Sequence, residues 1–508
     1  MNELNEAQRK AVEHTEGPSM ILAGAGSGKT RVLTYRIALL MKKGVDPFNI
    51  LALTFTNKAA REMKSRIARI VGESEAKALW MGTFHSVFSR ILRFESELIG
   101  YPKNFTIYDS DDSKSLLREI IKSMNLDDKV YKPSFILSRI SSAKNNLISP
   151  RQYMSNTLAI EEDKLARIPL FGQIFITYQK RLFKASAMDF DDLLFNTNLL
   201  LRDHPKVLFK YQEKFRYILV DEYQDTNFSQ YVIIRQLAAA FLNICVVGDD
   251  AQSIYAFRGA NIQNILNFEK DYPELVTFKL EQNYRSTKNI VEAANQVINN
   301  NKDQFKKSVW TQNDSGEKIT VIRASTDNEE GQKVAAAIFQ YKNHERLLNS
   351  AFAVLYRTNA QSRSIEEALR KMNIPYRIYG GLSFYQRKEI KDLMAYFRLV
   401  INSNDDESLR RIINYPARGI GQSTLDKLSV AAGDNEISIF TAIENVKDFN
   451  LGINAGTRAR LTDFVTMIRS FQQQLIQKDA YEVAHSIASA SGLLKDLHSD
   501  KTPEGVSR

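Results

Sequence analysis

The chain has 508 residues, of which 44% are hydrophobic and 25% are charged, and this ordinary globular composition excludes a disordered or collagen-like protein. Its 69 Lys and Arg against 59 Asp and Glu give a net charge of +10, which suits a polyanionic partner, and its single cysteine excludes an internal disulfide framework. Because the sequence has neither a run of about 18 apolar residues nor a signal peptide, we expect a cytoplasmic protein without a membrane partner.

Short apolar runs alternate with helical patterns in the first third of the chain and again after residue 215. We expect strands at residues 20–23, 50–55, 79–84, 217–220, 244–247 and 275–280. Strands that alternate with helices are typical of an α/β domain with a mainly parallel sheet. This domain is expected to comprise residues 1–90 and 212–280, and the charged, helical residues 91–211 are expected to form an insertion within it.

A second α/β pattern follows the first. We expect a second domain at residues 281–385, with strands at 319–323, 352–356 and 376–379. Residues 386–508 are again helical in pattern, which predicts a second helical insertion. The α/β pattern does not return after it, so we expect the second domain and its insertion to be incomplete.

A glycine-rich turn follows the first predicted strand and precedes a helix. Its backbone N–H groups can surround phosphate oxygens, Lys29 can reach the β- and γ-phosphates, and the Thr30 hydroxyl can bind Mg²⁺. The strict pattern has glycine in place of Ala23. We predict a nucleotide site formed by Ala23, Gly24, Ala25, Gly26, Ser27, Gly28, Lys29 and Thr30.

Two acidic residues, Asp221 and Glu222, end the predicted strand at 217–220. A carboxylate at such a strand end can hold Mg²⁺ opposite the phosphate loop, and the neighbouring glutamate can take a proton from the attacking water. An acidic strand end alone is common on any surface, but an upstream phosphate loop favours the catalytic interpretation.

The strand predicted at 244–247 leads into a loop with both polar and aromatic residues. Gln252 follows closely enough to sense a γ-phosphate. Tyr255, Phe257 and Arg258 suit base stacking and backbone contact with a nucleic acid. The alternative for the two rings is that they fill a hydrophobic core.

Seven motifs in fixed order resemble superfamily 1 DNA helicases of the UvrD, Rep and PcrA type. They are LNEAQRKAV (4–12), AGAGSGKT (23–30), TFTNKAAREM (54–63), GTFHS (82–86), VDEYQDTN (220–227), VVGDDAQSIYAFRGA (246–260) and LEQNYRS (280–286). The resemblance implies two RecA-like domains, each with a helical insertion, and an ATP-dependent helicase that moves 3′→5′ on single-stranded DNA. It also implies action at junctions with duplex DNA, in repair or replication restart.

The resemblance assigns roles around the nucleotide. Gln8 matches an adenine-reading glutamine, and Arg36 and Tyr284 match a pair that encloses the adenine ring. Gln252 matches the γ-phosphate sensor, and Arg285 matches an arginine that the second motor domain presents to the γ-phosphate.

The resemblance also assigns contacts with DNA. They are Phe55, Thr56, Asn57, Thr83, His85, Phe190, Tyr255, Phe257, Arg258, Arg357 and Asn359. Relatives often have tryptophan in place of Phe257. Residues 416–421 resemble a duplex contact of the helix–hairpin type, with a plain turn as the alternative.

Two motifs that relatives carry near their ends, H-x-x-K-G-L-E and Y-V-x-x-T-R-A, do not occur after residue 386. We therefore expect a fragment or a naturally truncated product. Two other classes remain open. A non-catalytic, ATP-gated module that binds single-stranded DNA would lack DNA-stimulated turnover, whereas a metabolic P-loop kinase would need a small-molecule acceptor pocket.

Overall fold

The computed structural model describes residues 3–302, 304–380, 384–499 and 501–502. The chain forms two compact units, one made of residues 1–315 and 395–508 and the other of residues 316–394. The domain boundary predicted at residue 281 lies within the first unit, as do Tyr284 and Arg285.

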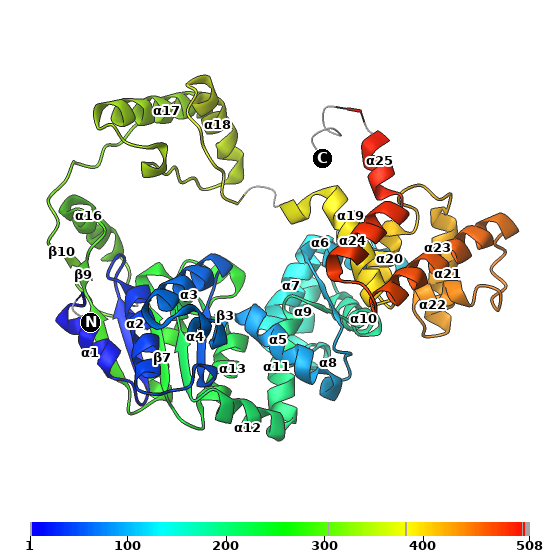
Figure 1. Cartoon of the computed structure of the whole chain (residues 1–508), viewed down its shortest axis with the longest axis horizontal. Coiled ribbons are helices and arrows are strands. Elements are labelled where there is room, and N and C mark those ends of the chain that lie inside the picture. Colours follow the sequence, from blue (N-terminus) through cyan, green and yellow to red (C-terminus); the bar gives the residue numbers. More distant parts are fainter. Residues whose placement is uncertain (1–2, 303, 381–383, 500, 503–508) are drawn as a thin grey trace. The chain divides into compact units, whose positions relative to one another are not determined.

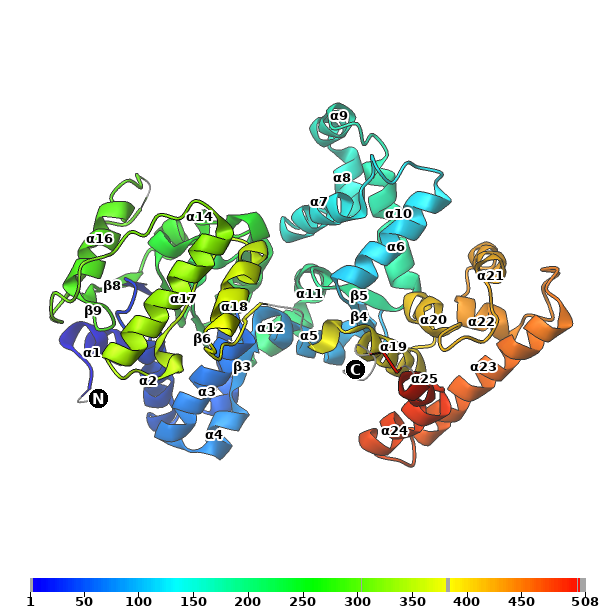
Figure 2. The ribbon, with the colours of Figure 1, turned by 90° about the horizontal axis from the view of Figure 1, so that it is seen from above.

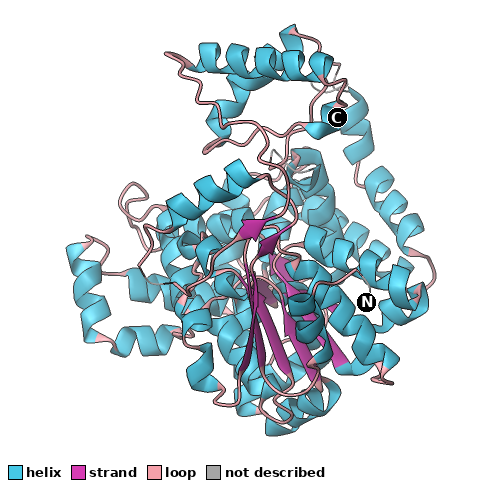
Figure 3. Ribbon diagram, turned by 90° about the vertical axis from the view of Figure 1, so that its left-hand side faces the viewer, coloured by secondary structure: helices cyan, strands magenta, loops and turns pink. Residues whose placement is uncertain are grey.

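The first unit contains a six-stranded sheet with helices on both sides (Figure 3). Its order is β3-β2-β6-β7-β1-β8, and all five pairs of neighbouring strands are parallel. The strands are β1 (Ser19–Ala23), β2 (Ile50–Thr54), β3 (Trp80–Thr83), β6 (Tyr217–Val220), β7 (Ile244–Gly248) and β8 (Val276–Leu280). The six strands predicted for this domain are confirmed, with small shifts: Phe55 follows β2, and Phe84 already begins a helix.

Both faces of this sheet are buried, which explains its nearly continuous apolar strands. Successive residues point to opposite faces: Met20 and Leu22 belong to one core, and Ile21 and Ala23 belong to the other. Residues from the following helices cover the face with Ile21: α1 (Glu6–Glu13), α2 (Lys29–Lys42), α3 (Asn57–Val71) and α4 (Glu73–Ala78).

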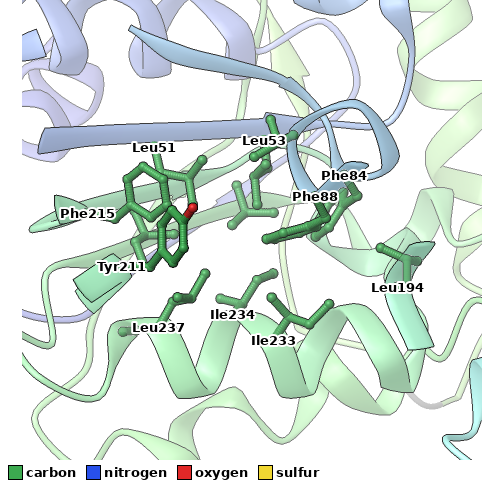
Figure 4. Packing of buried hydrophobic residues seen from close by; sticks show 14 of the residues in the cluster. Leu51, Leu53, Phe84, Phe88, Leu194, Tyr211, Phe215, Ile233, Ile234 and Leu237 are labelled. Atoms are coloured by element: carbon green, nitrogen blue, oxygen red, sulfur yellow. The ribbon is translucent and has the colours of Figure 1, made fainter. Parts of the chain in front are cut away.

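The opposite face of the sheet is covered by helices from later in the chain. They include α5 (Phe84–Glu95), α11 (Asp192–Asp203), α12 (Pro205–Lys214), α13 (Phe228–Ala238), α14 (Gln263–Leu266) and α15 (Phe268–Asp271). Figure 4 shows Leu51 and Leu53 of β2 in the same cluster as Phe84 of α5 and Ile233 of α13. These two layers fix the strand ends from which the site is built.

The insertion was predicted at residues 91–211, but α11 and most of α12 within these bounds belong to the layer that covers the sheet. The insertion that remains is helical with one small sheet. Its elements are β4 (Thr106–Tyr108), α6 (Ser110–Ser123), α7 (Pro133–Asn145), α8 (Pro150–Ser155), α9 (Thr157–Leu165), α10 (Phe171–Lys184) and β5 (Ala187–Asp189). β4 and β5 pair in parallel, and the helices enclose a core of their own.

The last part of the chain is helical, as predicted. Its helices are α19 (Lys388–Ile401), α20 (Asp406–Ile412), α21 (Gln422–Asp434), α22 (Ile439–Glu444), α23 (Ala455–Gln474), α24 (Ala480–Ala490) and α25 (Leu493–Ser499) (Figures 1 and 2). This part contacts the insertion through buried polar groups. The Tyr108 hydroxyl donates to Asp405 Oδ1 (2.8 Å), and Asn402 Nδ2 donates to Ala185 O (2.9 Å).

The second unit contains α17 (Asp327–His344) and α18 (Ser362–Lys371), which pack on each other through a small apolar core. The strands predicted at 319–323, 352–356 and 376–379 are wrong, because these segments form neither strand nor helix. Val321 is 91% exposed and Leu355 is 93% exposed. A strand needs neighbours for its backbone N–H and C=O groups, and these segments form no ladder in the part of the chain that the structure describes.

Candidate nucleotide and nucleic-acid site

The glycine-rich turn follows β1 and ends where α2 begins at Lys29. Gly26 (φ 70°) and Gly28 (φ 90°) adopt left-handed backbone conformations, which glycine tolerates best. A Cβ at Gly26 would lie 2.8 Å from Asn283 Nδ2, and one at Gly28 would lie 2.9 Å from Gln8 Nε2. The turn therefore needs glycine for both its conformation and its close neighbours, and it leads into a helix N-terminus suited to phosphate.

Lys29 and the two acidic residues after β6 meet at this turn. Lys29 Nζ lies 2.9 Å from Glu222 Oε2. Glu222 has a φ of 51°, a strained conformation for a residue with a side chain, and such strain is typical of functional sites. The structure thus brings together the predicted phosphate-binding lysine and the predicted base.

Asp221 is 3% exposed at the end of β6. Burial, and then the negative charge of Glu222, raise the pKa of Asp221 to about 7, while Lys29 opposes this rise. Its Oδ1 accepts a hydrogen bond from the Glu222 N–H (3.0 Å). A buried carboxylate that lacks a full countercharge suits a cation, and Mg²⁺ is typically held by one or two carboxylates together with phosphates. Asp221 therefore fits the predicted role of an Mg²⁺ ligand, and Thr30, the other predicted ligand, is the second residue of α2.

The end of β7 is joined to the end of β6 by Gln224, a residue that the motif analysis did not single out. Gln224 Nε2 donates to Glu222 Oε2 (3.0 Å), and its Oε1 accepts from the Asp249 N–H (2.9 Å). The predicted sensor Gln252 donates through Nε2 to Asp249 Oδ2 (2.6 Å). A continuous hydrogen-bonded path therefore runs from Lys29 through Glu222 to Gln252. The sequence feature that could have identified Gln224 is its place within the motif VDEYQDTN.

The predicted base-binding side contains Gln8 and Tyr284. Gln8 is 1% exposed and donates through Nε2 to Ser27 O (2.9 Å). The Tyr284 N–H donates to Gly26 O (3.0 Å), and its ring is 46% exposed. Asn5 Nδ2 donates to the Tyr284 hydroxyl (2.6 Å), so Asn5, which was not predicted, ties α1 to Tyr284.

The assignment of Arg36 to the adenine ring is contradicted. Arg36 is 2% exposed, and its guanidinium donates to Ala11 O (2.7 Å) and Ser19 Oγ (3.1 Å). A side chain that stabilises the packing of α1 and β1 in this way is not available for stacking. Arg31, in the first turn of α2, is exposed instead, and its Cβ lies 3.8 Å from a Cβ placed on Gly28.

Arg285 is exposed and is the second residue after β9 (Gln282–Asn283). Asn283 Oδ1 accepts from the Arg285 N–H (2.8 Å), and Asn283 Nδ2 donates to Ala25 O (2.7 Å). Asn283, which the motif analysis did not assign, thus links Arg285 directly to the phosphate loop.

The predicted DNA residues after β2 and β3 lie at helix starts. Thr56 Oγ1 accepts from Ala59 N (3.1 Å) ahead of α3, in which Asn57 is the first residue, and Thr83 Oγ1 accepts from Ser86 N (3.3 Å) ahead of α5. Phe55 is half-buried, with its ring centroid 5.5 Å from that of Phe84. The two threonines therefore act as helix N-caps, which fixes the loops beside them.

His85 and Phe190 are brought together although they lie far apart in the sequence. Their rings stack with centroids 3.8 Å apart and planes inclined by 19°. Burial lowers the pKa of His85 to about 4, so this imidazole is neutral at pH 7. Phe190 is 55% exposed. The neighbouring Asp189 and Asp192 are held by the buried Lys144, at 2.7 and 2.8 Å, which fixes the loop that carries this ring.

Tyr255 and Phe257 form an exposed aromatic pair after β7. Phe257 is 76% exposed and Tyr255 is 39% exposed, with ring centroids 6.0 Å apart. The Arg258 guanidinium carbon lies 5.3 and 5.4 Å from the two ring centroids. Because both rings are exposed, the alternative that they fill a core is not supported.

The remaining predicted contacts lie elsewhere in the chain. Arg357 and Asn359 belong to the second unit, where the Arg357 N–H donates to Gln361 Oε1 (3.0 Å). In residues 416–421, Arg418 points inward and donates to Ile412 O and Ser491 O, both at 2.9 Å. This arrangement favours a structural turn for residues 416–421.

Comparisons with known proteins agree with the motif analysis. The family model of the UvrD/REP helicase N-terminal domain matches residues 4–273, and that of the UvrD-like helicase C-terminal domain matches residues 278–498. The ATP-dependent DNA helicase PcrA of Staphylococcus aureus is 46% identical over 509 residues, which cover 100% of this chain and 68% of the relative. PcrA of Staphylococcus epidermidis is 47% identical over 506 residues, covering 99% and 68%. These matches do not establish the predicted truncation.

Proposed function

This chain belongs to the UvrD/Rep family of ATP-dependent DNA helicases, and from this premise we propose that it moves 3′→5′ along single-stranded DNA, driven by ATP hydrolysis. We propose that it separates strands at junctions between single-stranded and duplex DNA, in the repair or restart of replication in the cytoplasm. Among the described residues, no helix has the length and apolarity required to cross a membrane.

One observation carries this proposal: six predicted motifs follow the carboxyl ends of the six parallel strands of one sheet. Ligands of open α/β sheets bind outside these ends. The strands β6, β7, β1 and β8 are neighbours and lead to Glu222, Gln252, the phosphate loop and Arg285. Beyond β6 in the sheet, the carboxyl end of β2 leads to Phe55 and that of β3 leads to His85. The loop after β7 continues to Tyr255 and Phe257.

The chemistry follows from the contacts of Lys29. In the structure Lys29 pairs with Glu222. A bound triphosphate would attract Lys29, since phosphate carries more charge than a carboxylate, and Glu222 would be released to accept a proton from water. That water attacks the γ-phosphorus, the bond to the β-phosphate oxygen breaks, and ADP and phosphate leave. Mg²⁺, held by Thr30 and Asp221, would neutralise charge on the phosphates.

The base of the nucleotide is assigned to the exposed side of this loop. We propose that Tyr284 and Arg31, rather than Arg36, enclose the base, with Gln8 beside them. Support comes from the exposure of both side chains and from the contacts that tie Tyr284 to Gly26 and Asn5.

The DNA is assigned to the aromatic side chains. We propose that bases stack on Phe257, Tyr255 and Phe190, and that Arg258 contacts the backbone. Exposed rings beside a cation are what binding of single strands without sequence preference requires. Phe55, Thr56, Asn57, Thr83, His85, Arg357 and Asn359 remain proposed DNA contacts.

The function is tested with two partial duplexes that differ only in the polarity of the single-stranded tail. We expect DNA-stimulated ATP turnover with both, and strand separation only with the 3′ tail. Separation of the 5′-tailed duplex alone would contradict the polarity. ATP-dependent DNA binding without stimulated turnover would instead identify a non-catalytic clamp.

A further inference from the structure

Lys307, which lies outside all the motifs, contacts the two acidic residues that follow β7. Lys307 lies between α16 (Lys288–Ile298) and β10 (Trp310–Thr311). Its Nζ makes ion pairs with Oδ1 of Asp249 and with Oδ1 of Asp250. The side chain of Lys307 is 8% exposed, and those of the two aspartates are 3% and 0% exposed. One buried cation therefore balances two adjacent buried carboxylates, which would otherwise repel each other.

The remaining oxygens of this cluster lead to the γ-phosphate sensor. Asp249 Oδ2 accepts from Gln252 Nε2 (2.6 Å), and Asp250 Oδ2 accepts from the Phe305 N–H (2.9 Å). A carboxylate can only accept hydrogen bonds, so the amide nitrogen of Gln252 must face Asp249. The orientation of the Gln252 amide, including the direction of its carbonyl oxygen, is thereby set by the position of Asp249.

The segment that carries Lys307 also touches the phosphate loop and the strand before Arg285. A Cβ placed on Gly24 would lie 2.6 Å from Val309 Cγ2. Trp310 and Thr311 pair in parallel with Gln282 and Asn283. The segment thus runs along β9, which leads directly to Tyr284 and Arg285, and reaches the end of β7 through Lys307.

We propose that Lys307 is a positioning residue for ATP hydrolysis: it holds Asp249 so that the Gln252 amide keeps a fixed orientation toward the γ-phosphate and the attacking water. The inference rests on the proposed function. It adds a residue that acts through Asp249 and Gln252 and does not touch the nucleotide. Because Lys307 lies between β9 and β7, it connects the predicted sensor Gln252 to the segment that carries Arg285.

The test compares two neighbouring lysines in the full chain. Lys307→Met should lower the kcat of DNA-stimulated ATP turnover roughly 10- to 100-fold, the loss typical when a partner that orients an active group is removed. The KM for ATP should stay within about twofold, because Lys29 and the phosphate loop are intact. Lys306→Met removes the same charge from an exposed neighbour and should match the wild type. Lys307→Arg, which keeps the charge, should recover most of the loss.

A double variant separates positioning from general stability. If Lys307 acts through Gln252, Gln252→Ala together with Lys307→Met should turn over no more slowly than the slower single variant. Losses that multiply, or a Lys307→Met variant equal to Lys306→Met, would overturn the inference alone. A wild type without DNA-stimulated turnover would overturn the proposed function, and the inference with it.

Loss of the buried cation can also unfold the protein. In that case Lys307→Met is combined with Asp250→Asn, which restores the balance of charge while Asp249 still lacks its cation. The same fall in kcat at unchanged KM supports the positioning role, and wild-type turnover in this folded variant contradicts it.

Discussion

The sheet of the first unit and the irregular segments of the second unit have the same kind of sequence but different structures. Both contain short apolar runs next to amphipathic helices, and both were predicted as strands. Leu53 in β2 is 1% exposed, whereas Leu355 is 93% exposed. β2 has β3 and β6 as neighbours, and residues 352–356 form no ladder. An apolar run becomes a strand only where neighbours satisfy its backbone and other elements cover its faces.

This difference extends to the functional residues. Glu222 and Gln252 follow paired strands, and hydrogen bonds through Gln224 hold them in place. Arg357 and Asn359 follow a segment without a ladder. Side chains on a rigid element are positioned more accurately than those on irregular segments. We therefore expect the largest functional effects from substitutions at the carboxyl ends of the strands, and the smallest from those in the second unit.

The largest effect is expected at the proposed base. Glu222→Gln should lower DNA-stimulated ATP turnover by roughly 10²- to 10⁴-fold, because the amide cannot accept the proton from water. Binding of ATP and DNA should persist, since Lys29 and the aromatic residues remain. Steady-state turnover and DNA-binding titrations measure the two properties separately. Glu73→Gln, at an exposed position of α4, is the matched control. Turnover at the wild-type rate would remove Glu222 as the base.

The core of the sheet is tested by stability. Leu53→Ala should lower the free energy of unfolding by about 2–5 kcal/mol, because it leaves a cavity between α5 and α13. Figure 4 shows this residue among the rings and aliphatic chains of the cluster. Denaturant unfolding, followed by a signal from the first unit, gives the value. A loss below about 0.5 kcal/mol, as found for surface positions, would mean that β2 is not central to the fold.

Removal of one aromatic ring should have a smaller and more selective effect. Phe257→Ala should weaken binding of single-stranded DNA by about 1–3 kcal/mol, the contribution of one stacked base. Stability should change little, because the ring is 76% exposed. Fluorescence anisotropy with a labelled oligonucleotide measures the affinity. If affinity is unchanged, Phe257 does not contact the strand.

The pH dependence of Mg²⁺ use tests the buried carboxylate of Asp221. Burial and then Glu222 raise its pKa to about 7. Mg²⁺ requires the ionised form, so its affinity should fall as pH falls through about 7. With this pKa, the affinity should be roughly tenfold lower at pH 6 than at pH 8.

Glu222→Gln supplies the control for this titration. Removal of the charge that helps to raise the pKa of Asp221 should move the midpoint to lower pH. Titration of Mg²⁺-dependent nucleotide binding at each pH gives both midpoints. The same midpoint in both variants would contradict a role for Asp221 in this dependence.

The first domain could be predicted closely, because its signals are local. Apolar runs and turn residues placed the six strands, and the motifs at their ends placed Lys29, Glu222 and Gln252. The local sequence also contained the evidence against the assignment of Arg36 to the adenine ring. Arg36 shares a helix face with Val32, Leu33 and Leu40, all of which are buried, so the spacing of apolar residues indicated its burial. Arg31 lies on the exposed side.

Other features depend on contacts between distant residues. Lys307 pairs with Asp249, which is 58 residues away in the sequence, and His85 stacks on Phe190, which is more than one hundred residues away. No local pattern marks such partners. The strands expected in the second unit failed for the same reason, because a ladder is a property of two segments and a hydrophobic run describes only one.

Leu355 provides the smallest expected effect and the sharpest contrast with Leu53. Leu355→Ala should change the free energy of unfolding by less than about 0.5 kcal/mol, because a side chain that is 93% exposed has little buried area to lose. Thermal unfolding of this variant and of Leu53→Ala under the same conditions compares the two apolar runs directly. A loss near that of Leu53→Ala would show that residues 352–356 are buried in solution. In that case, the difference between Leu53 and Leu355 in the structure would reflect how the second unit is arranged there, and not the sequence of residues 352–356.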